Sequence, residues 1–398
     1  MRNLAIIIPT LNGGGAERTA SNLSIFFDKI YNVHLIVFDA RNIRYPYAGT
    51  LHDLSLPPKT GKIGKLINLI RRISRTKKIK AIEKIDVSIS LMDGPNLVNI
   101  FSRNGHEVVI TSIRIFMSKA SGFSGSIPYF REMLMKITGS KSDKIVTLSK
   151  GVESDLIKSF HIPPSKITTI YNPCDGELLL EKSSLDILRS MKMGAHSVAT
   201  MGRMTPQKGQ WLLIRAFSKV LKRIPDAKLY ILGTGILESR LKELAEKLHI
   251  SSSIEFCGFM EAPHRLIQAC RVFVFPSLYE GLGNVIIESL ACGTPAIACD
   301  CLSGPREILA PDTEYVGSLK SAEYGAYGIL VKVANDNTFD AKKTLSDTEI
   351  QLADAIIDVL ENDHVWERYH NAALLRSKFF SYNSIMREWQ NLIEHCIS

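Results

Sequence analysis

Residues 280–288 read Glu-Gly-Leu-Gly-Asn-Val-Ile-Ile-Glu, with a carboxylate at each end of a glycine-containing turn. The apolar run that precedes them, residues 271–277, ends in Pro-Ser, which is typical of a buried strand that stops at a loop. From Asn284 apolar residues recur at helical spacing until the Gly-Thr-Pro at 293–295. The sequence therefore predicts a strand, a turn and a helix of an α/β fold.

The chemistry of this turn suits a phosphorylated ligand that carries hydroxyl groups. The amides that open a helix attract phosphate oxygens, and carboxylates such as Glu280 and Glu288 accept hydrogen bonds from sugar hydroxyls. Taken alone, the same nine residues are equally consistent with a solvent-exposed helix that has an ordinary Glu in its first turn.

A second segment supplies positive charge. Residues 198–209 read Val-Ala-Thr-Met-Gly-Arg-Met-Thr-Pro-Gln-Lys-Gly, a strand that ends in Gly202-Arg203 and is followed by Lys208. Arginine offers a planar fork for phosphate oxygens and lysine a compact charge, so the pair can neutralise a diphosphate without a metal. An isolated Arg and Lys at this spacing are more often two surface cations. The succession of this segment and then residues 280–288 along the chain makes the pattern specific.

This order of segments resembles that of the retaining GT-B glycosyltransferases, in the large family that includes group 1 enzymes of bacterial surface polysaccharide and lipid-linked oligosaccharide assembly. The resemblance covers nearly the whole chain. It extends to a glycine turn, a passage between domains and several strand ends, at residues 6–18, 170–175, 229–235, 254–259, 303–308 and 327–331. It implies an α/β fold of two Rossmann-like domains whose parallel sheets face each other across a cleft.

Length agrees with two domains. The 398 residues exceed the roughly 250–300 that usually share one core. We expect an amino-terminal acceptor domain at 1–172, a nucleotide-sugar donor domain at 173–380, and a terminal helix at 381–398 that crosses back to the first domain.

The resemblance also implies roles for individual residues. Arg203 and Lys208 would stabilise charge on the leaving diphosphate, Glu280 would orient the transferred sugar, and Glu288 would accept hydrogen bonds from the ribose. Further substrate contacts are expected at Gly14, Gly15, Arg114, Gly202, Phe259, Gly283, Asn284 and Val285. The product would keep its anomeric configuration through front-face attack, without a metal, a cofactor or a protein nucleophile.

The donor expected from the resemblance is a UDP-linked hexose or N-acetylhexosamine, with GDP as the second choice. The acceptor is expected to be a glycan on a polyprenyl diphosphate or lipid core, with a soluble acceptor left open.

One segment departs from the family pattern. Many relatives have a His after a strand of the first domain, where residues 108–114 of this chain end in Arg114. Arg114 could contact a sugar hydroxyl or an anionic acceptor, or could be an ordinary cation at a strand end. His106 is expected to be a turn residue, and Glu17 and Arg18 either contact substrate or cap the first helix.

Positive charge is concentrated in residues 62–80 of a chain whose net charge is +9. Apolar residues recur there at helical spacing, at Ile63, Leu66, Ile67, Ile70 and Ile73. The sequence predicts a basic helix whose apolar stripe packs on the sheet and whose cations face anionic lipid headgroups. No DNA-reading motif or aromatic-rich strand accompanies the charge, so no nucleic-acid partner is expected.

The expected location is the cytoplasm, peripheral on the inner face of the cytoplasmic membrane. No secretion signal opens the sequence and no apolar run approaches the ~18 residues of a membrane span. The seven scattered cysteines are typical of reduced core thiols. Cys299-Asp300-Cys301 lacks a second ligand pair, so no zinc site is expected there, and the chain has no Asp-x-Asp.

Three other functions remain to be compared. A nucleotide-sugar epimerase that hydrolyses its donor shares the two-domain fold. A dehydrogenase would need a Gly-x-Gly-x-x-Gly fingerprint, which residues 12–17 lack. A non-catalytic scaffold would bind anionic membrane or nucleotide through its basic face, and the intact set Arg203, Lys208, Glu280 and Glu288 argues against a site without activity.

Overall fold

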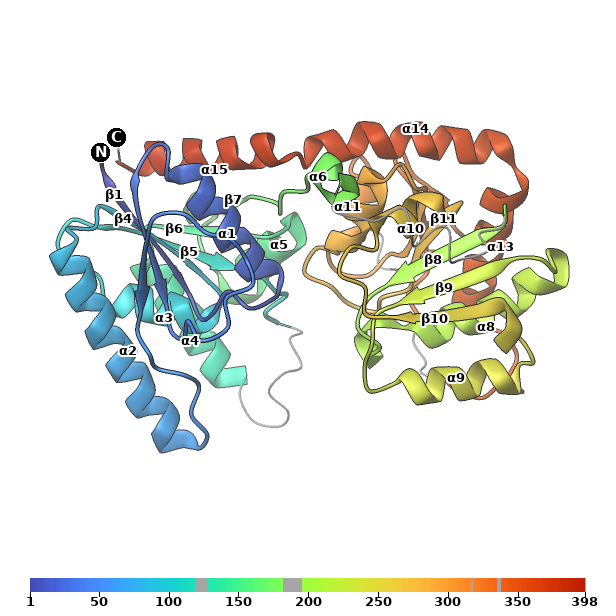
Figure 1. Ribbon diagram of the computed structural model, residues 1–398, viewed down its shortest axis with the longest axis horizontal. Coiled ribbons are helices and arrows are strands. Elements are labelled where there is room, and N and C mark those ends of the chain that lie inside the picture. The colour runs from blue at the N-terminus through green and yellow to red at the C-terminus, as the bar shows by residue number, and fades with distance from the viewer. Residues whose placement is uncertain (119–127, 182–194, 316–317, 335–337, 398) are drawn as a thin grey trace. The chain divides into compact units, whose positions relative to one another are not determined.

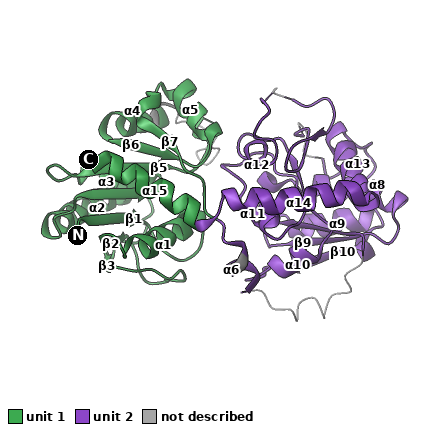
Figure 2. Ribbon diagram, turned by 90° about the horizontal axis from the view of Figure 1, so that it is seen from above, with its two compact units in different colours: residues 1–173, 383–398 green, residues 174–382 purple. Residues whose placement is uncertain are grey.

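The chain forms two compact units, each an α/β structure with a mainly parallel sheet (Figure 2). The computed structural model describes residues 1–118, 128–181, 195–315, 318–334 and 338–397. Unit 1 contains Met1–Pro173 and Asn383–Ser398, and unit 2 contains Cys174–Tyr382.

Within the described residues, unit 1 is built on a parallel seven-stranded sheet (Figure 1). Its strands are β1 (Asn3–Ile8), β2 (Asn32–Val37), β3 (Thr50–Asp53), β4 (Val87–Leu91), β5 (Val108–Ile113), β6 (Lys144–Thr147) and β7 (Ile167–Thr169). They lie in the order β3-β2-β1-β4-β5-β6-β7. The central β1 is buried on both faces, which explains its unbroken apolar run.

Helices lie between these strands and at the end of the chain. They are α1 (Gly15–Phe27), α2 (Lys62–Ile82), α3 (Asp93–Phe101), α4 (Pro128–Lys141), α5 (Lys150–Phe160), the short η1 (Pro164–Lys166) and α15 (Tyr382–Ile397). The end of α15 lies beside the start of the chain, where Arg2 Nη1 donates to the Ile397 carbonyl at 3.3 Å. The two ends of the chain therefore lie together in unit 1 (Figure 1).

The helix predicted at 62–80 forms as α2, but the prediction that its apolar stripe packs on the sheet was wrong for four of the five stripe residues, and only Ile73 packs inward. The side chains at Ile63, Leu66, Ile67 and Ile70 are exposed, by 43–76%. The face that packs inward is offset from this stripe and includes Leu69, Ile73, Asn68, Thr76, Ile79 and Lys80. Asn68 can be buried here because its side-chain amide donates to the Pro57 carbonyl at 2.7 Å.

In the described part of unit 2, a second seven-stranded sheet has the order β10-β9-β8-β11-β12-β14-β13. Its strands are β8 (Ser197–Met201), β9 (Lys228–Leu232), β10 (Ile254–Gly258), β11 (Val272–Phe275), β12 (Ala296–Cys299), β13 (Glu323–Tyr324) and β14 (Ile329–Val331). Neighbouring strands are parallel except for β13, a short antiparallel edge strand beside β14.

The helices of unit 2 pack around an apolar core that includes Trp211 and Phe217. They are α6 (Gly176–Glu181), η2 (Pro206–Lys208), α8 (Gln210–Arg223), α9 (Glu238–Lys247), η3 (Ser251–Ser253), α10 (His264–Ala269), α11 (Asn284–Ala291), α12 (Pro305–Leu309), α13 (Asp347–Glu361) and α14 (Asp363–Phe379). No helix of the described chain is long and apolar enough to cross a bilayer.

Candidate active site

The predicted donor residues follow two neighbouring strands at the centre of the unit 2 sheet. Gly202 and Arg203 come directly after β8, and Glu280 lies in the loop after β11. From β8 the sheet continues to β9 and β10 on one side, and from β11 it continues to β12 and β14 on the other. The strand order therefore reverses between β8 and β11. Open parallel sheets bind their ligands outside the carboxyl ends of the strands at such a point.

Lys208 and Glu280 form an ion pair at this edge. Lys208 Nζ lies 2.6 Å from Glu280 Oε1, and the two side chains are 16% and 10% exposed. The ammonium also lies over the Phe275 ring, 5.0 Å from its centroid. The lysine stem lies against Gly202, where an added Cβ would be 3.3 Å from Lys208 Cδ. Gly202 thus leaves room for the lysine to reach the carboxylate.

Hydrogen bonds hold together the loops that follow β8 and β11. The side chain of Gln207 donates to the Tyr279 carbonyl at 2.9 Å, and the Leu278 amide donates to the Gln207 carbonyl at 2.9 Å. Gly209, at φ 61°, allows this approach, because a Cβ there would collide with the Pro276 carbonyl oxygen. The position of Lys208 is therefore fixed by its neighbours on both sides.

Glu288 lies one turn into α11, beyond Gly283, which adopts a left-handed conformation at φ 89° and caps the helix that begins at Asn284. His264 Nε2 lies 3.4 Å from Glu288 Oε2. The sequence analysis missed His264, since a single His at the start of a short helix has no recognisable spacing. The arrangement offers a carboxylate and an imidazole close to a helix amino terminus.

Two other predicted residues of unit 2 are exposed. Arg203 follows β8, and Phe259 follows β10. Within the described residues neither belongs to the Lys208–Glu280 ion pair. The Arg203 carbonyl accepts a hydrogen bond from Gln210 Nε2 at 3.3 Å, which fixes the backbone at this position.

In unit 1 the predicted glycine turn precedes α1. Gly14 has φ 152°, a backbone conformation that other residues rarely adopt, and the Glu17 carboxylate lies against it. Glu17 Oε1 in turn accepts a hydrogen bond from Thr10 Oγ1 at 3.4 Å. Glu17 therefore bonds within the turn, and Gly15 begins the helix.

Arg114 lies at the carboxyl end of β5, as predicted, and binds two residues that the sequence analysis missed. Its Nη2 donates to Thr19 Oγ1 at 2.9 Å and to Asn172 Oδ1. Its Nη1 is buried and has no hydrogen-bond partner among the described residues. Burial lowers the pKa of Arg114 to about 10, which still leaves it charged at neutral pH. Thr19 also donates to the Gly15 carbonyl at 2.9 Å, which joins the cation to the glycine turn.

A relative of the same length decides the family. Over 396 residues, 98% of this chain and 98% of the relative, the chain is 30% identical to the N-acetylgalactosamine-N,N'-diacetylbacillosaminyl-diphospho-undecaprenol 4-alpha-N-acetylgalactosaminyltransferase of Campylobacter jejuni. The family model described as glycosyl transferases group 1 matches residues 191–374. The chain belongs to the group 1 glycosyl transferases.

This glycosyl transferase is also 40% identical over 200 residues to an uncharacterized glycosyltransferase of Methanocaldococcus jannaschii, a match that spans 50% of the chain and about half, 49%, of that relative. Anabaena HepE, solved in complex with UDP and glucose, superposes with a TM-score of 0.74 at 16% identity over 98% of this chain and 99% of that one. Sucrose-phosphate synthase from Thermosynechococcus elongatus gives 0.77 at 16% identity, over 99% of each chain. The predicted GT-B fold is confirmed.

Proposed function

We propose that this glycosyl transferase moves a hexose or N-acetylhexosamine from a UDP-linked donor to a glycan carried on a polyprenyl diphosphate, with retention of anomeric configuration. The observation that carries the proposal is the Lys208–Glu280 pair at the strand-order reversal of unit 2, next to the helix that presents Glu288. A cation and two carboxylates at such an edge suit a ligand with both phosphates and hydroxyls.

Each residue has a part in the proposed reaction. Lys208, with Arg203, neutralises the charge that develops on the UDP leaving group, since a preorganised cation acts most strongly where charge appears. Glu280 holds Lys208 in place and accepts hydrogen bonds from the transferred sugar, while Glu288 accepts them from the ribose. The bond from the anomeric carbon to the diphosphate breaks as the acceptor oxygen attacks the same face. A phosphate oxygen then takes the acceptor's proton.

The remaining predicted contacts belong to the proposal as well. The backbone at Gly202, Gly283, Asn284 and Val285 would approach the phosphates, and Phe259 would lie near the base. In unit 1, Gly14, Gly15 and Arg114 would contact substrate. Arg114 is the most specific of these, because its buried Nη1 still has hydrogens to donate.

Two relatives support the choice of substrates. The Campylobacter jejuni relative is named for a substrate linked to diphospho-undecaprenol and for transfer of N-acetylgalactosamine, and it matches this chain over its full length. Anabaena HepE was solved with UDP and glucose, which favours a uridine nucleotide on this fold.

We also propose that the transfer step needs no divalent metal. Arg203 and Lys208 both lie in the segment that follows β8. They can supply the positive charge that a metal would otherwise bring to a diphosphate. If this is correct, UDP binding and donor turnover remain unchanged when a chelator is added.

A two-step experiment tests the function. Thermal unfolding is followed with UDP, GDP, ADP and NAD, each with and without magnesium, and we expect a rise with UDP that a chelator does not alter. Donor consumption is then measured with and without a polyprenyl-diphosphate glycan. Acceptor-dependent consumption, with the product anomer assigned by NMR, supports retaining transfer. Equal consumption without acceptor indicates an epimerase or hydrolase, and no consumption indicates a scaffold.

We further propose that α2 lies on an anionic membrane surface. Its exposed residues Ile63, Leu66, Ile67 and Ile70 form an apolar strip, and exposed cations such as Lys62, Lys65 and Arg71 flank it. A helix with both features binds the boundary between headgroups and acyl chains, where each nearby Lys or Arg contributes ~1 kcal/mol. This strip could therefore bring the enzyme to a lipid-linked acceptor at the inner face of the cytoplasmic membrane.

Vesicle flotation tests this contact with a matched pair of variants. Leu66→Ser removes an apolar side chain from the strip, and Leu375→Ser removes one of similar exposure, 62% against 58%, from α14 of unit 2. We expect only Leu66→Ser to weaken binding to vesicles rich in anionic lipid. Equal binding by both variants would exclude α2 as the contact.

A further inference from the structure

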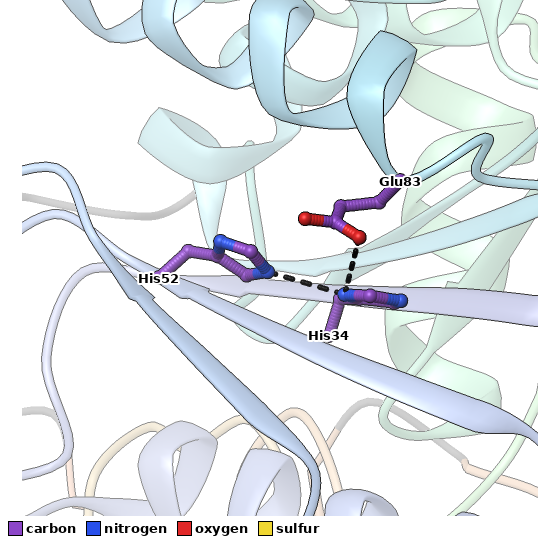
Figure 3. Close-up of side chains that lie close together, drawn as sticks. All are labelled: His34, His52 and Glu83. Carbon is purple, nitrogen blue, oxygen red and sulfur yellow. Dashed lines mark hydrogen bonds and ion pairs between the residues drawn. The ribbon is translucent and has the colours of Figure 1, made fainter.

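Two histidines and a glutamate converge on one face of the unit 1 sheet (Figure 3). His34 belongs to β2 and His52 to β3, and Glu83 directly follows α2. In the parallel register His34 pairs with Thr50 and Ile36 pairs with His52. The two histidines are thus offset by two positions, and alternate residues of a strand face the same side. That side is the one that α2 covers.

The distances between these side chains approach those of a metal site. His34 Nδ1 lies 3.1 Å from His52 Nε2 and 3.9 Å from Glu83 Oε2. One ligand atom from each residue lies within 4.8 Å of the others. Zinc binds histidine nitrogen at about 2.0–2.1 Å, so two nitrogens in a tetrahedral site are roughly 3.3 Å apart. The Glu83 carboxylate would have to move closer to the two rings for all three atoms to bind one cation.

The chemistry of the three groups selects the kind of cation. Burial lowers the pKa of His34, and burial together with the neighbouring His34 lowers the pKa of His52. Metals bind the neutral form of the imidazole ring, which is the form that burial favours. Two imidazoles and one carboxylate suit zinc and related transition metals, whereas magnesium and calcium favour ligands that are all oxygen.

We propose that His34, His52 and Glu83 bind one zinc ion or a similar divalent transition metal, with water completing the coordination. These three residues are not among those proposed to bind the donor, of which Lys208, Glu280 and Glu288 belong to unit 2. The site also lies away from the carboxyl ends of the strands, because His34 is in the middle of β2 and pairs with Ala5 of β1.

The bound metal would fasten α2 to the edge of the sheet. Arg72 and Arg75 of α2 already donate to the carbonyls of Leu56 and Leu54, which follow β3. The metal would add an attachment at the carboxyl end of α2, where Glu83 lies. Its effect would be on the stability of unit 1, since a ligand that binds only the folded state raises the free energy of unfolding.

Metal titration of the chelator-stripped full chain tests the proposal. Zinc binding is measured by calorimetry, and cobalt binding by its visible absorption, which separates histidine and carboxylate ligands from thiolates. The variants are His52→Ala and Glu83→Gln. The control is His106→Ala, which removes an exposed histidine of the same unit. Circular dichroism of the stripped proteins establishes that each variant is folded.

We expect one zinc per chain and a cobalt spectrum without thiolate charge-transfer bands. His52→Ala should weaken zinc binding by ~100-fold or more and Glu83→Gln by at least ~10-fold, because loss of an outer-shell partner alone costs about 10–100-fold. His106→Ala should bind as the wild type does, and zinc should raise the unfolding temperature only where it binds. Wild-type affinity in either cluster variant, or thiolate bands in the cobalt spectrum, would overturn the site. Neither result depends on donor turnover.

Discussion

Each unit contains a Lys–Glu pair with the same separation, but the two pairs have different surroundings. Lys80 and Glu107 in unit 1 lie 2.6 Å apart with both side chains 0% exposed. Lys208 and Glu280 in unit 2 also lie 2.6 Å apart, but both side chains reach solvent. Distance alone therefore does not separate a structural ion pair from a candidate for catalysis.

Neighbouring groups make the difference. Lys80 Nζ also donates to Asn99 Oδ1 at 2.6 Å, to the Asn99 carbonyl at 3.2 Å and to Ser88 Oγ at 3.4 Å. Among the described residues the Lys208 ammonium has one hydrogen-bond partner, Glu280. An ammonium has three hydrogens to donate, so Lys208 has hydrogens left for a phosphate and Lys80 has none. A buried pair with all its hydrogens used holds the fold, whereas a partly open pair can bind an anion.

The largest effect is expected from breaking the buried pair. Lys80→Ala leaves Glu107 buried without its partner, which should lower the free energy of unfolding by ~3–5 kcal/mol. Urea denaturation of the wild type and the variant measures the loss. Lys208→Ala is the matched control and should change stability by less than ~1 kcal/mol, since its pair is partly exposed. Equal losses in the two variants would remove the distinction between the pairs.

The second effect is on catalysis. Lys208→Ala removes the cation proposed to stabilise the leaving diphosphate, and turnover should fall by ~10²–10³-fold. The affinity for UDP should change less, because the charge on the leaving group is greatest in the transition state. Single-turnover kinetics with saturating donor measures the chemical step. Lys219→Ala, which removes a half-buried lysine of α8 that pairs with Asp354, is the control. A normal rate in Lys208→Ala would reject the proposed role.

A third, smaller effect concerns donor binding. Glu288→Ala removes the acceptor proposed for the ribose hydroxyls, and a hydrogen bond to a charged group contributes ~1.5–3 kcal/mol. UDP affinity should therefore fall by about tenfold or more, as measured by calorimetry. Glu261→Ala, an exposed carboxylate in the loop before α10, should bind UDP normally. If both variants bind UDP equally well, Glu288 does not contact the nucleotide.

The sequence predicted what depends on local pattern. The strand, turn and helix around residues 280–288 and the glycine turn before α1 follow from apolar runs and glycines. The GT-B fold was implied by the resemblance to a known family. The orientation of α2 did not follow, because a hydrophobic pattern cannot show that Asn68 and Lys80 find partners in the interior. The partners of Arg114 and Glu288 could not be predicted either, because they come from distant parts of the chain.

The smallest effect is a pH dependence that belongs to the buried pair alone. Burial lowers the pKa of Lys80 from 10.5 to about 8, although Glu107 partly offsets this. Between these values the unfolded chain holds a proton that the folded chain has lost, so the contribution of Lys80 to stability rises with pH. Below about pH 8 the cost of burying the charged lysine is fully present, and above pH 10.5 it is absent.

A double variant, Lys80→Met with Glu107→Leu, lacks both charges and serves as the reference. The stability of the wild type relative to this variant should rise from pH 8 to 9, by less than ~1.4 kcal/mol. A difference that stays constant would show that Lys80 keeps an ordinary pKa, and that its saturated hydrogen bonds outweigh its burial.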